Sequence, residues 1–482
     1  MVEEDTKISA WEEIDPHLKL ERIRVRNFRN IRDLDVTIPE DKNIICLVGP
    51  NGGGKSALLS VIINALCNLT DESVPDRNDE GVTLGFSKFR LSWSREEIGS
   101  DGPAFGLVMN WKSEYSDFGY KFLVANHESV THRFTKNLCK EFGFSEKEYM
   151  VNQWDISAKR DVPLKISEEG AGDPIAKSVI LFRPSDRFET PYYEGKQNRS
   201  VSPRTEFNWS GNRPYPIGSK SGLLNLESFI LDMTLDNKLE YRHASLANDN
   251  LIKALKIIRK GDEEFVVRPW PFRRVGLGRL EALSLLSAGE LDILVTVGDI
   301  ISQQVYLLEK FNPGGDHEIT PSGWVFIDEV DSHLHPQWQQ KVLPVLSELF
   351  PTINFMVTTH SPFVLRSLPE NRSLVIRLPD GEVFDDDFSS WRIDDILDVV
   401  FNIPSLWSPE VEKKLEQLQD FISEPEHHEK ATDIYSELAN RGNSLRSACD
   451  RIVAVYGSPE IRDRIVKLNE TQPMEENLHE AG

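Results

Sequence analysis

The chain has 482 residues, of which 39% are hydrophobic, and its formal net charge is −23. This length exceeds one ordinary domain and the apolar content is sufficient for packed cores, so we expect roughly two to four domains, or one domain with large insertions. The excess of acid excludes a protein whose whole surface binds nucleic acid, because such binding needs Lys and Arg facing the phosphates; a local basic groove remains compatible with it.

The cysteines and the N-terminal residues indicate the cellular compartment in which the protein is expected. The four cysteines are scattered and contain no C-x-x-C pair, so the sequence indicates neither a disulfide framework nor a zinc site. The N-terminus is acidic where a signal peptide is basic and apolar, and no apolar run approaches the length of a membrane span. We therefore expect a soluble, cytoplasmic protein that does not bind a membrane.

The first predicted elements are a polar tail over residues 1–17 and two β-strands over 18–39, joined at 27–30. The arginines of the segment Arg22–Arg32 are interleaved with its apolar residues. Two interpretations stay open: the arginines form the solvated face of an edge hairpin, or some of them, Arg29 first, face a nucleotide or a nucleic acid.

Residues 49–56 fit the pattern G-x-x-x-x-G-K-[ST], between an apolar run at 44–48 and a second one at 57–63 that suits a buried helix. This context predicts a phosphate-binding loop, because backbone N–H groups converge on phosphates only where no Cβ obstructs them. Lys55 is expected to reach the β- and γ-phosphates of ATP, and the Ser56 hydroxyl to bind Mg²⁺. The predicted nucleotide contacts of the loop are Asn51, Gly52, Gly53, Gly54, Lys55 and Ser56.

The middle of the chain predicts mixed structure. Strand-like runs at 89–93, 105–109 and 120–124 predict an antiparallel β-meander beside the nucleotide site. Residues 192–222 are rich in Pro, Gly, Asn and Ser and predict a long loop, and helical periodicity follows over 223–258.

A basic and aromatic segment, Arg268–Arg279, follows these helices and combines four arginines with Trp270 and Phe272. Such a mixture is typical of single-stranded nucleic-acid contacts. An Arg-rich surface strand beside the nucleotide site is an equally compatible interpretation.

A second chemical motif lies at Trp324–Ile327, an apolar strand that ends in Asp328 and Glu329. Such a strand delivers Asp328 to the Mg²⁺ shell, and Glu329 can polarise the attacking water. Either acid alone would be uninformative, but together with the phosphate loop they predict ATP hydrolysis to ADP and phosphate.

Two further motifs flank this strand. Leu286–Glu290 has the sequence Leu-Ser-Ala-Gly-Glu before an apolar helix, and His360 ends the apolar strand at 353–359. Alone, the first would be a helix cap, with Ser287 followed three residues later by Glu290, and the second a structural histidine. The first motif can serve both as a cap and as a functional loop.

The order and spacing of these motifs resemble those of the ATP-binding-cassette (ABC) ATPases, with Walker A, signature, Walker B and switch histidine in turn. The resemblance implies a head-to-tail homodimer or higher even oligomer. In it, Ser287 and Gly289 of one subunit close on the γ-phosphate held by Lys55 of the other, and His360 holds the γ-phosphate or the attacking water.

The interval between Walker A and signature lacks the sustained heptads of SMC-type machines, so the chain is more similar to the compact RecF-like and OLD-like proteins. The strings at 327–339 and 358–362 resemble the ATPases of Septu-type anti-phage systems, also found with some retrons. That resemblance implies control of a separate HNH-type nuclease. The alternative is a RecF-like ATP-dependent DNA clamp without a nuclease partner.

Two acidic clusters admit other interpretations. Asp331, His333 and His335 could form a metal site, although the intervening Leu334 and Pro336 favour a packed turn. Asp385–Asp387 imitates a nuclease D-x-D motif, but an acidic surface turn is favoured, since paired carboxylates without a third ligand bind Mg²⁺ poorly.

The expected fold class is α/β: an ABC-type P-loop ATPase head with an antiparallel β-meander lobe, a helical insertion and a helical C-terminal region. The expected divisions are a disordered tail (1–17), an N-terminal ATPase lobe (18–190), a loop and helical insertion (191–285), a C-terminal ATPase lobe (286–378), and a helical region with a disordered tail (379–482).

Overall fold

A computed structural model describes residues 19–28, 30–59, 62–63, 106–113, 116–125, 178–183, 185, 222–239, 241–259, 264–267, 274–280, 282–311, 321–403 and 407–471. The chain divides into two compact units, Met1–Phe401 and Asn402–Gly482, and each is described by itself. Residues 379–401, which the sequence analysis grouped with the C-terminal region, belong to the first unit.

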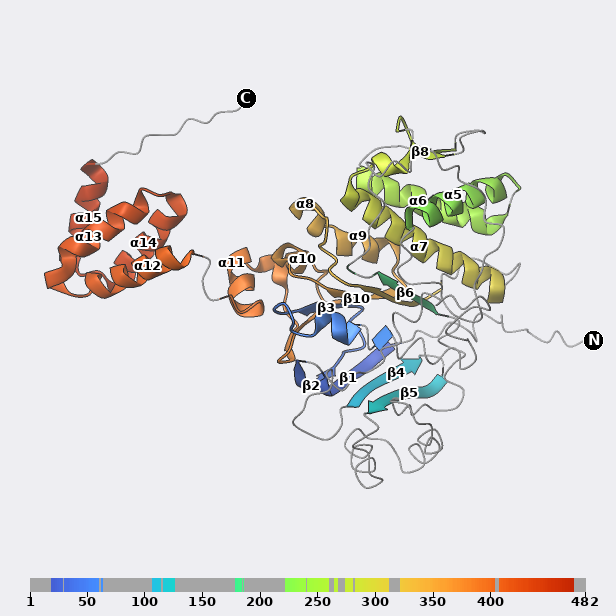
Figure 1. The fold of residues 1–482 in the computed structure, drawn as a ribbon, viewed down its shortest axis with the longest axis horizontal. Coiled ribbons are helices and arrows are strands. Elements are labelled where there is room, and N and C mark those ends of the chain that lie inside the picture. Colours follow the sequence, from blue (N-terminus) through green and yellow to red (C-terminus); the bar gives the residue numbers. More distant parts are fainter. Residues whose placement is uncertain are drawn as a thin grey trace, which may run out of the picture. The chain divides into compact units, whose positions relative to one another are not determined.

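The first unit is built on a six-stranded sheet in the order β12-β11-β3-β10-β9-β6. Its strands are β3 (Ile44–Val48), β6 (Val179–Arg183), β9 (Gly323–Ile327), β10 (Ile353–Thr358), β11 (Ser373–Arg377) and β12 (Glu382–Phe384). Figure 1 labels its strands β3, β6 and β10. All neighbours are parallel except the edge pair of β11 and β12. Every residue of β3, β6, β9 and β10 is buried, as in parallel strands covered on both faces. The loops that follow β3, β9 and β10 therefore meet at one edge of the sheet.

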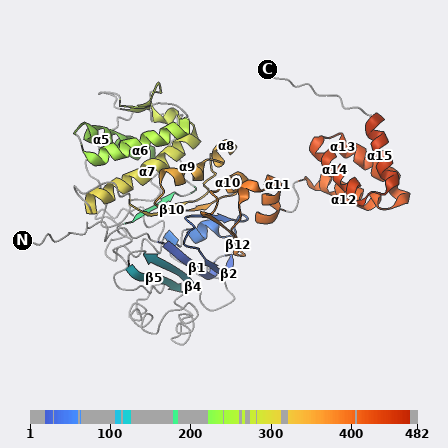
Figure 2. The ribbon, with the colours of Figure 1, turned by 180° about the vertical axis from the view of Figure 1, so that it is seen from behind.

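A separate antiparallel sheet has the order β2-β1-β4-β5. Its strands are β1 (Lys19–Phe28), β2 (Ile31–Thr37), β4 (Gly106–Ser113) and β5 (Ser116–Ala125). They confirm the two strands predicted over 18–39 and two runs of the predicted meander, while the run at 89–93 lies outside the described residues. Figures 1 and 2 show this sheet and the long helices on opposite sides of the central sheet.

The long helices of the first unit are α5 (Gly222–Lys238), α6 (Arg242–Arg259) and α7 (Ala288–Phe311). The first two confirm the helical periodicity predicted over 223–258. Contact between α5 and α7 is close, since a Cβ at Gly298 would lie 2.4 Å from Leu226 Cδ1. Among the described helices, α7 alone is long and apolar enough to cross a membrane. Because 83% of that apolar window is buried, its composition suits a core helix equally well.

Short elements complete the first unit: β7 (Phe265–Val267), β8 (Val275–Leu277), η5 (Leu283–Leu285), α8 (Pro336–Gln339), α9 (Val342–Leu349), α10 (Pro362–Arg366), η6 (Phe388–Ser390), α11 (Ile393–Asp395) and η7 (Ile396–Val400). Strands β7 and β8 form an antiparallel pair. Only residues 274–279 of the basic segment predicted over 268–279 are described.

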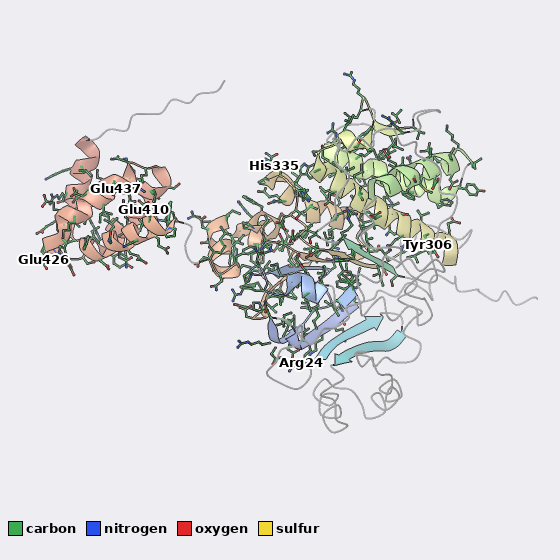
Figure 3. All side chains as sticks on the ribbon, in the orientation of Figure 1. Arg24, Tyr306, His335, Glu410, Glu426 and Glu437 are labelled. Carbon is green, nitrogen blue, oxygen red and sulfur yellow. The ribbon has the colours of Figure 1, made fainter. Side chains whose placement is uncertain are left out.

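The second unit is a helical bundle with its own apolar core. It contains α12 (Pro409–Ile422), η8 (Pro425–His427), α13 (His428–Ala439), α14 (Asn443–Tyr456) and α15 (Pro459–Thr471). Ser408 caps α12, because its Oγ accepts a hydrogen bond from Val411 N at 3.4 Å. The side chains of Figure 3 show Glu410, Glu426 and Glu437 on this unit. These helices confirm the helical C-terminal region of the expected fold class.

Candidate nucleotide-binding site

The loop at 49–56 has a backbone that only glycine adopts readily. Gly49, Gly52 and Gly54 have φ values of 134°, 78° and 97°. Space is also restricted, because a Cβ at Gly49 would lie 2.1 Å from Leu378 O, and one at Gly54 would lie 2.9 Å from Ile31 Cγ1. The loop is thus enclosed by β2 and by the residue after β11, and a side chain at Gly49 or Gly54 would not fit there.

Lys55 begins the helix that follows this loop, whose described residues are 55–59 and 62–63. Its side chain is buried, and its Nζ donates to Gly49 O at 2.9 Å and to Pro50 O at 3.0 Å. Burial lowers the pKa of the Lys55 ammonium, and nearby carboxylates, Asp328 first, oppose this effect. The loop therefore places a cation beside the acids that end β9.

The oxygen atoms predicted to bind Mg²⁺ lie next to each other. Asp328 Oδ1 accepts hydrogen bonds from Ser56 Oγ at 2.9 Å and from Thr358 Oγ1 at 2.6 Å. Hydroxyl and carboxylate oxygens are the ligands that Mg²⁺ prefers, and here they come from the end of the phosphate loop and from the residue after β9. The donor set of Ser56 and Asp328 therefore fits a Mg²⁺ ion bound together with nucleotide.

Glu329 follows in a left-handed backbone conformation, with φ of 49°, which is uncommon for a residue other than glycine. Its backbone N donates to Thr358 Oγ1 at 2.7 Å, and its Oε2 accepts from Ser332 Oγ at 2.9 Å. Thr358 thus bonds to both predicted acidic residues, through its own proton to Asp328 and through its lone pair to Glu329.

His360 is exposed at the end of the neighbouring strand, and the turn after β9 holds its backbone. Asp331 Oδ1 accepts from Thr359 Oγ1 at 2.5 Å and from His360 N at 3.3 Å. Burial lowers the pKa of the His360 imidazole, as does the nearby Lys55 ammonium, and three carboxylates, Asp331 first, oppose them. His360 therefore lies close enough to Lys55 and to the acids after β9 for their charges to shift its pKa.

Polar side chains in and after the turn that follows β9 form hydrogen bonds with other groups of the protein. His335 Nδ1 accepts from Gln337 N at 3.3 Å and so caps α8. Gln339 donates to Leu334 O at 3.0 Å and accepts from Ser361 Oγ at 2.6 Å. Within the described residues, no group of three His, Cys, Asp or Glu side chains is placed to bind a metal. These bonds support the packed turn rather than a metal site.

The signature segment forms the helix cap that its sequence also predicted. Ser287 Oγ donates to Glu290 Oε2 at 2.7 Å, and Glu290 N donates back to Ser287 Oγ at 3.3 Å. A Cβ at Gly289 would lie 3.0 Å from Leu334 Cδ2. The start of α7 therefore packs on the turn after β9 of its own chain, and contact of Ser287 with a nucleotide stays a prediction.

Two of the described N-terminal arginines pair with acids of β2, and the more exposed of them, Arg22, fits the solvated-hairpin interpretation. Arg22 pairs with Asp35 at 2.6 Å, and Arg24 pairs with Asp35 at 2.6 Å and with Asp33 at 3.6 Å. The hydrogen bond from Arg22 is the largest cause that lowers the pKa of the Asp35 carboxyl. Arg29 lies outside the described residues.

The acidic turn at 385–387 also serves the fold. Asp385 forms an ion pair with the buried Lys42, and Asp387 Oδ1 accepts from Ser389 N at 3.0 Å as a helix cap. These partners match the acidic turn that the sequence favoured over a nuclease motif.

Four contributors to the site were missed by the sequence analysis: Arg183, Thr358, Thr359 and Gln339. Arg183, at the end of β6, pairs with Asp292 at 2.8 Å and with Asp299 at 3.2 Å on α7. Its carbonyl also accepts from Asp328 N at 2.8 Å. Thr358, Thr359 and Gln339 lie in the strings at 327–339 and 358–362 that carry the family resemblance, and Arg183 follows an apolar run at 179–182.

Together, the phosphate loop after β3 and the acids after β9 in a parallel sheet define a P-loop ATPase of the ABC type. The family comparisons agree: residues 22–200 match the family described as "AAA domain", and residues 236–366 match "AAA domain, putative AbiEii toxin, Type IV TA system".

The chain belongs to the family of the retron Ec83 probable ATPase of Escherichia coli. It is 34% identical to that protein over 464 residues, which cover 83% of this chain and 79% of the relative. It is also 25% identical to the retron Vc95 probable ATPase of Vibrio cholerae serotype O1 biovar El Tor, over 74% of this chain and 73% of the relative. The Septu protein PtuA of Bacillus thuringiensis is 27% identical over 36% of this chain and 46% of the relative.

Proposed function

We propose that this protein is a Mg²⁺-dependent ATPase that dimerises on ATP and controls a separate HNH-type nuclease in anti-phage defence. The observation that carries the ATPase assignment is the convergence of Ser56 and Thr358 on one oxygen of Asp328. Because these hydroxyls come from the phosphate loop and from the strand that precedes His360, their shared bond to the proposed metal ligand supports a single nucleotide site.

Each predicted side chain has a task in hydrolysis. The loop amides of residues 51–56 and Lys55 would bind and orient the triphosphate, and Ser56 and Asp328 would hold Mg²⁺, which would supply positive charge beside the phosphates. Glu329 accepts a proton from the attacking water, while Ser332 orients its carboxylate. His360 donates to the γ-phosphate or orients the water.

Dimerisation completes the site in this proposal. Ser287 is exposed at the start of α7, where a hydroxyl and a helix N-terminus favour an anion. The same subunit holds its own nucleotide through Lys55. A second copy would therefore supply Ser287 and Gly289 to that nucleotide, and an isolated subunit would bind ATP but hydrolyse it poorly.

The test is Glu329→Gln, with Glu348→Gln on α9 as a control at an exposed acid. Loss of the base should lower turnover by about a hundredfold or more while ATP binding persists. Fluorescent ATP binding and phosphate release measure the two quantities. Full hydrolysis by Glu329→Gln would contradict the assignment of the base.

The partner assignment rests on the resemblance of the strings at 327–339 and 358–362 to Septu-type ATPases, and it has its own experiment. Co-expression with an HNH-type protein encoded beside this chain should give a stable complex whose DNA cleavage depends on ATP. Salt-dependent DNA binding by the isolated chain, with no associated nuclease, would instead support the RecF-like clamp.

A further inference from the structure

The hydroxyl of the signature serine is exposed but already engaged. Ser287 Oγ donates to Glu290 Oε2 at 2.7 Å, and Ser287 N donates to the same oxygen at 3.0 Å. A hydroxyl has a single proton, so while it donates to Glu290 it does not donate to a phosphate. The carboxylate of Glu290 therefore determines both where Ser287 points and how readily its proton is released to another acceptor.

The second oxygen of that carboxylate is bound by a residue of another helix. Arg259, at the end of α6, donates from Nη1 to Glu290 Oε1 at 2.9 Å. The pair is largely shielded from water, with side-chain exposures of 30% for Arg259 and 15% for Glu290. Burial raises the pKa of the Glu290 carboxyl, but the hydrogen bonds from Ser287 and Arg259 outweigh it and lower the pKa. Glu290 is thus negatively charged, with one oxygen on Ser287 and the other on Arg259.

This charge lies where an anion is expected to arrive. In the proposed dimer, Ser287 meets the triphosphate held by a second copy, and a carboxylate bonded to Ser287 would repel it. The guanidinium of Arg259 cancels the charge and also fixes the carboxylate in a rigid, charge-assisted hydrogen bond.

We propose that Arg259 is a positioning residue of the composite nucleotide site: it holds Glu290 on Ser287 and cancels the repulsion between that carboxylate and the incoming triphosphate. This inference rests on the proposed function, because it requires Ser287 to contact the nucleotide of a second copy. It adds a residue from α6, outside every nucleotide-binding motif, to the groups that determine ATP affinity of the dimer.

The test compares Arg259→Ala, Glu290→Gln and the double variant in the full-length protein with ATP and Mg²⁺. Arg259→Ala leaves an uncompensated carboxylate and should raise KM for ATP by about tenfold, with a much smaller change in kcat. Glutamine keeps the capping box but carries no charge, so adding Glu290→Gln to Arg259→Ala should return KM to within about threefold of wild type. If the ion pair only stabilised the fold, the double variant would recover nothing.

A control on the same helix is Lys253→Ala, which breaks an exposed pair with Glu348 at 4.0 Å and should leave KM unchanged. A wild-type KM for Arg259→Ala, or a double variant as impaired as Arg259→Ala, would overturn the role of Arg259.

Ser287→Ala separates the two proposals. If it leaves both turnover and ATP-driven dimerisation unchanged, the signature does not contact nucleotide and the proposed dimer is wrong. If Ser287→Ala is impaired while Arg259→Ala is not, only the role of Arg259 is wrong.

Discussion

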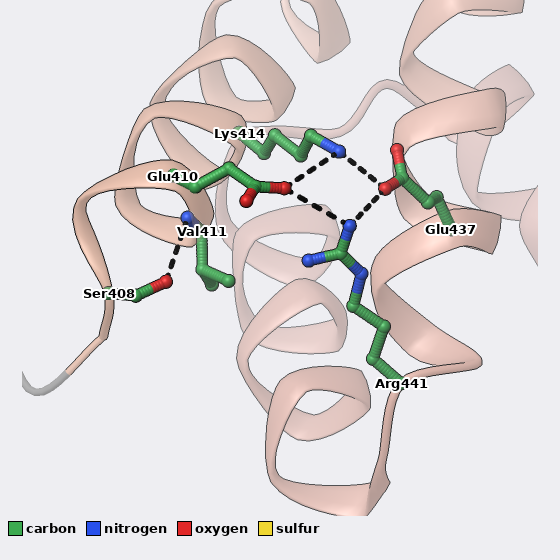
Figure 4. A network of polar contacts seen from close by, with 6 residues as sticks. All are labelled: Ser408, Glu410, Val411, Lys414, Glu437 and Arg441. Carbon is green, nitrogen blue, oxygen red and sulfur yellow. Dashed lines mark hydrogen bonds and ion pairs between the residues drawn. The ribbon is translucent and has the colours of Figure 1, made fainter.

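One ion-pair cluster in each compact unit can be compared, and the two clusters lie in opposite environments. In the first unit, the Arg183 side chain is 6% exposed and joins β6 to two aspartates of α7. In the second, Glu410, Lys414, Glu437 and Arg441 form a ring of ion pairs on the surface of α12 and α13 (Figure 4). A buried charge that loses its partner cannot be solvated, whereas water and salt replace a surface partner at little cost. The ion pairs of Arg183 are therefore expected to contribute strongly to the stability of the first unit. The ring of surface ion pairs is expected to contribute little to the stability of the second.

The buried ion pairs of Arg183 join two elements that lie next to the candidate nucleotide site. Strand β6 is the neighbour of β9, which ends in Asp328, and α7 begins at the signature. Arg183 thus connects the helix that carries Ser287 to the strand beside the predicted metal ligand. The ring in the second unit connects only helices of one bundle.

The largest effect is expected from Arg183→Ala, which leaves the buried Asp292 and the partly exposed Asp299 without this guanidinium. It should lower the free energy of unfolding by about 3–5 kcal/mol. Hydrogen exchange resolved along the chain should show faster exchange in β6, β9 and α7, with α12–α15 unchanged. Arg22→Ala, which removes the exposed partner of Asp35, should cost less than about 1 kcal/mol. Equal losses from the two variants would break the comparison.

A smaller, pH-dependent effect is expected from Glu227→Gln on α5. Glu227 is buried, and burial raises its pKa to about 7, against an opposing effect of Arg274. Below the unfolded pKa the residue is protonated in both states; as pH rises toward 7 the unfolded chain ionises first, so stability falls. The variant removes this loss and should be more stable by on the order of 2–3 kcal/mol at pH 8, with no gain near pH 4.5.

Denaturant titrations across this pH range measure the difference for Glu227→Gln. The exposed control, Glu348→Gln, should show no pH-dependent gain. Parallel pH curves for Glu227→Gln and wild type would contradict the prediction.

Thr358→Val should have a mixed effect on stability and chemistry. The variant keeps the shape of the buried side chain but loses the hydrogen bonds to Asp328 and from Glu329 N, so we expect a stability loss of about 1–3 kcal/mol and reduced ATP turnover. Thr358→Ser retains the hydroxyl and should recover turnover. If valine and serine were equally active, the hydroxyl would have no role in arranging the acids.

The smallest effect is expected in the second unit, from Lys414→Gln combined with Arg441→Gln. Since the ring is exposed, its loss should shift Tm by less than about 2 °C, and high salt should erase the difference. The hydrogen bond from Lys414 is the largest cause that lowers the pKa of Glu437, so the contribution of the ring is present above the unfolded pKa and fades as pH falls. A loss as large as that of Arg183→Ala would show that the ring contributes strongly to stability after all.

The nucleotide motifs could be predicted because their chemistry is local in the sequence. The loop at 49–56 has its three positive-φ glycines and its lysine within eight adjacent positions, and Asp328 and Glu329 end one strand. Capping was predictable for the same reason, as at Ser408 before α12 and at Ser287 before α7.

The contacts between elements could not be predicted, because they depend on the order of strands in the sheet. Arg183 and Asp292 are 109 residues apart, and Thr358 and Asp328 are 30 apart. The sequence separation of each pair does not by itself indicate a contact. The contacts can be inferred only once β6, β9 and β10 are known to be neighbours. Strand β12 escaped prediction because it has only three residues.

Thr358 also has a consequence for how the site can fail. One hydroxyl fixes the spacing between the carboxylate that holds the metal and the backbone of the residue that takes the proton, and that hydroxyl is placed by the alignment of β10 on β9. A slip of one strand along the other would displace both acids in a single step. Metal binding and water activation are therefore expected to be gained and lost together, as one cooperative property of strand alignment rather than as two separable ones.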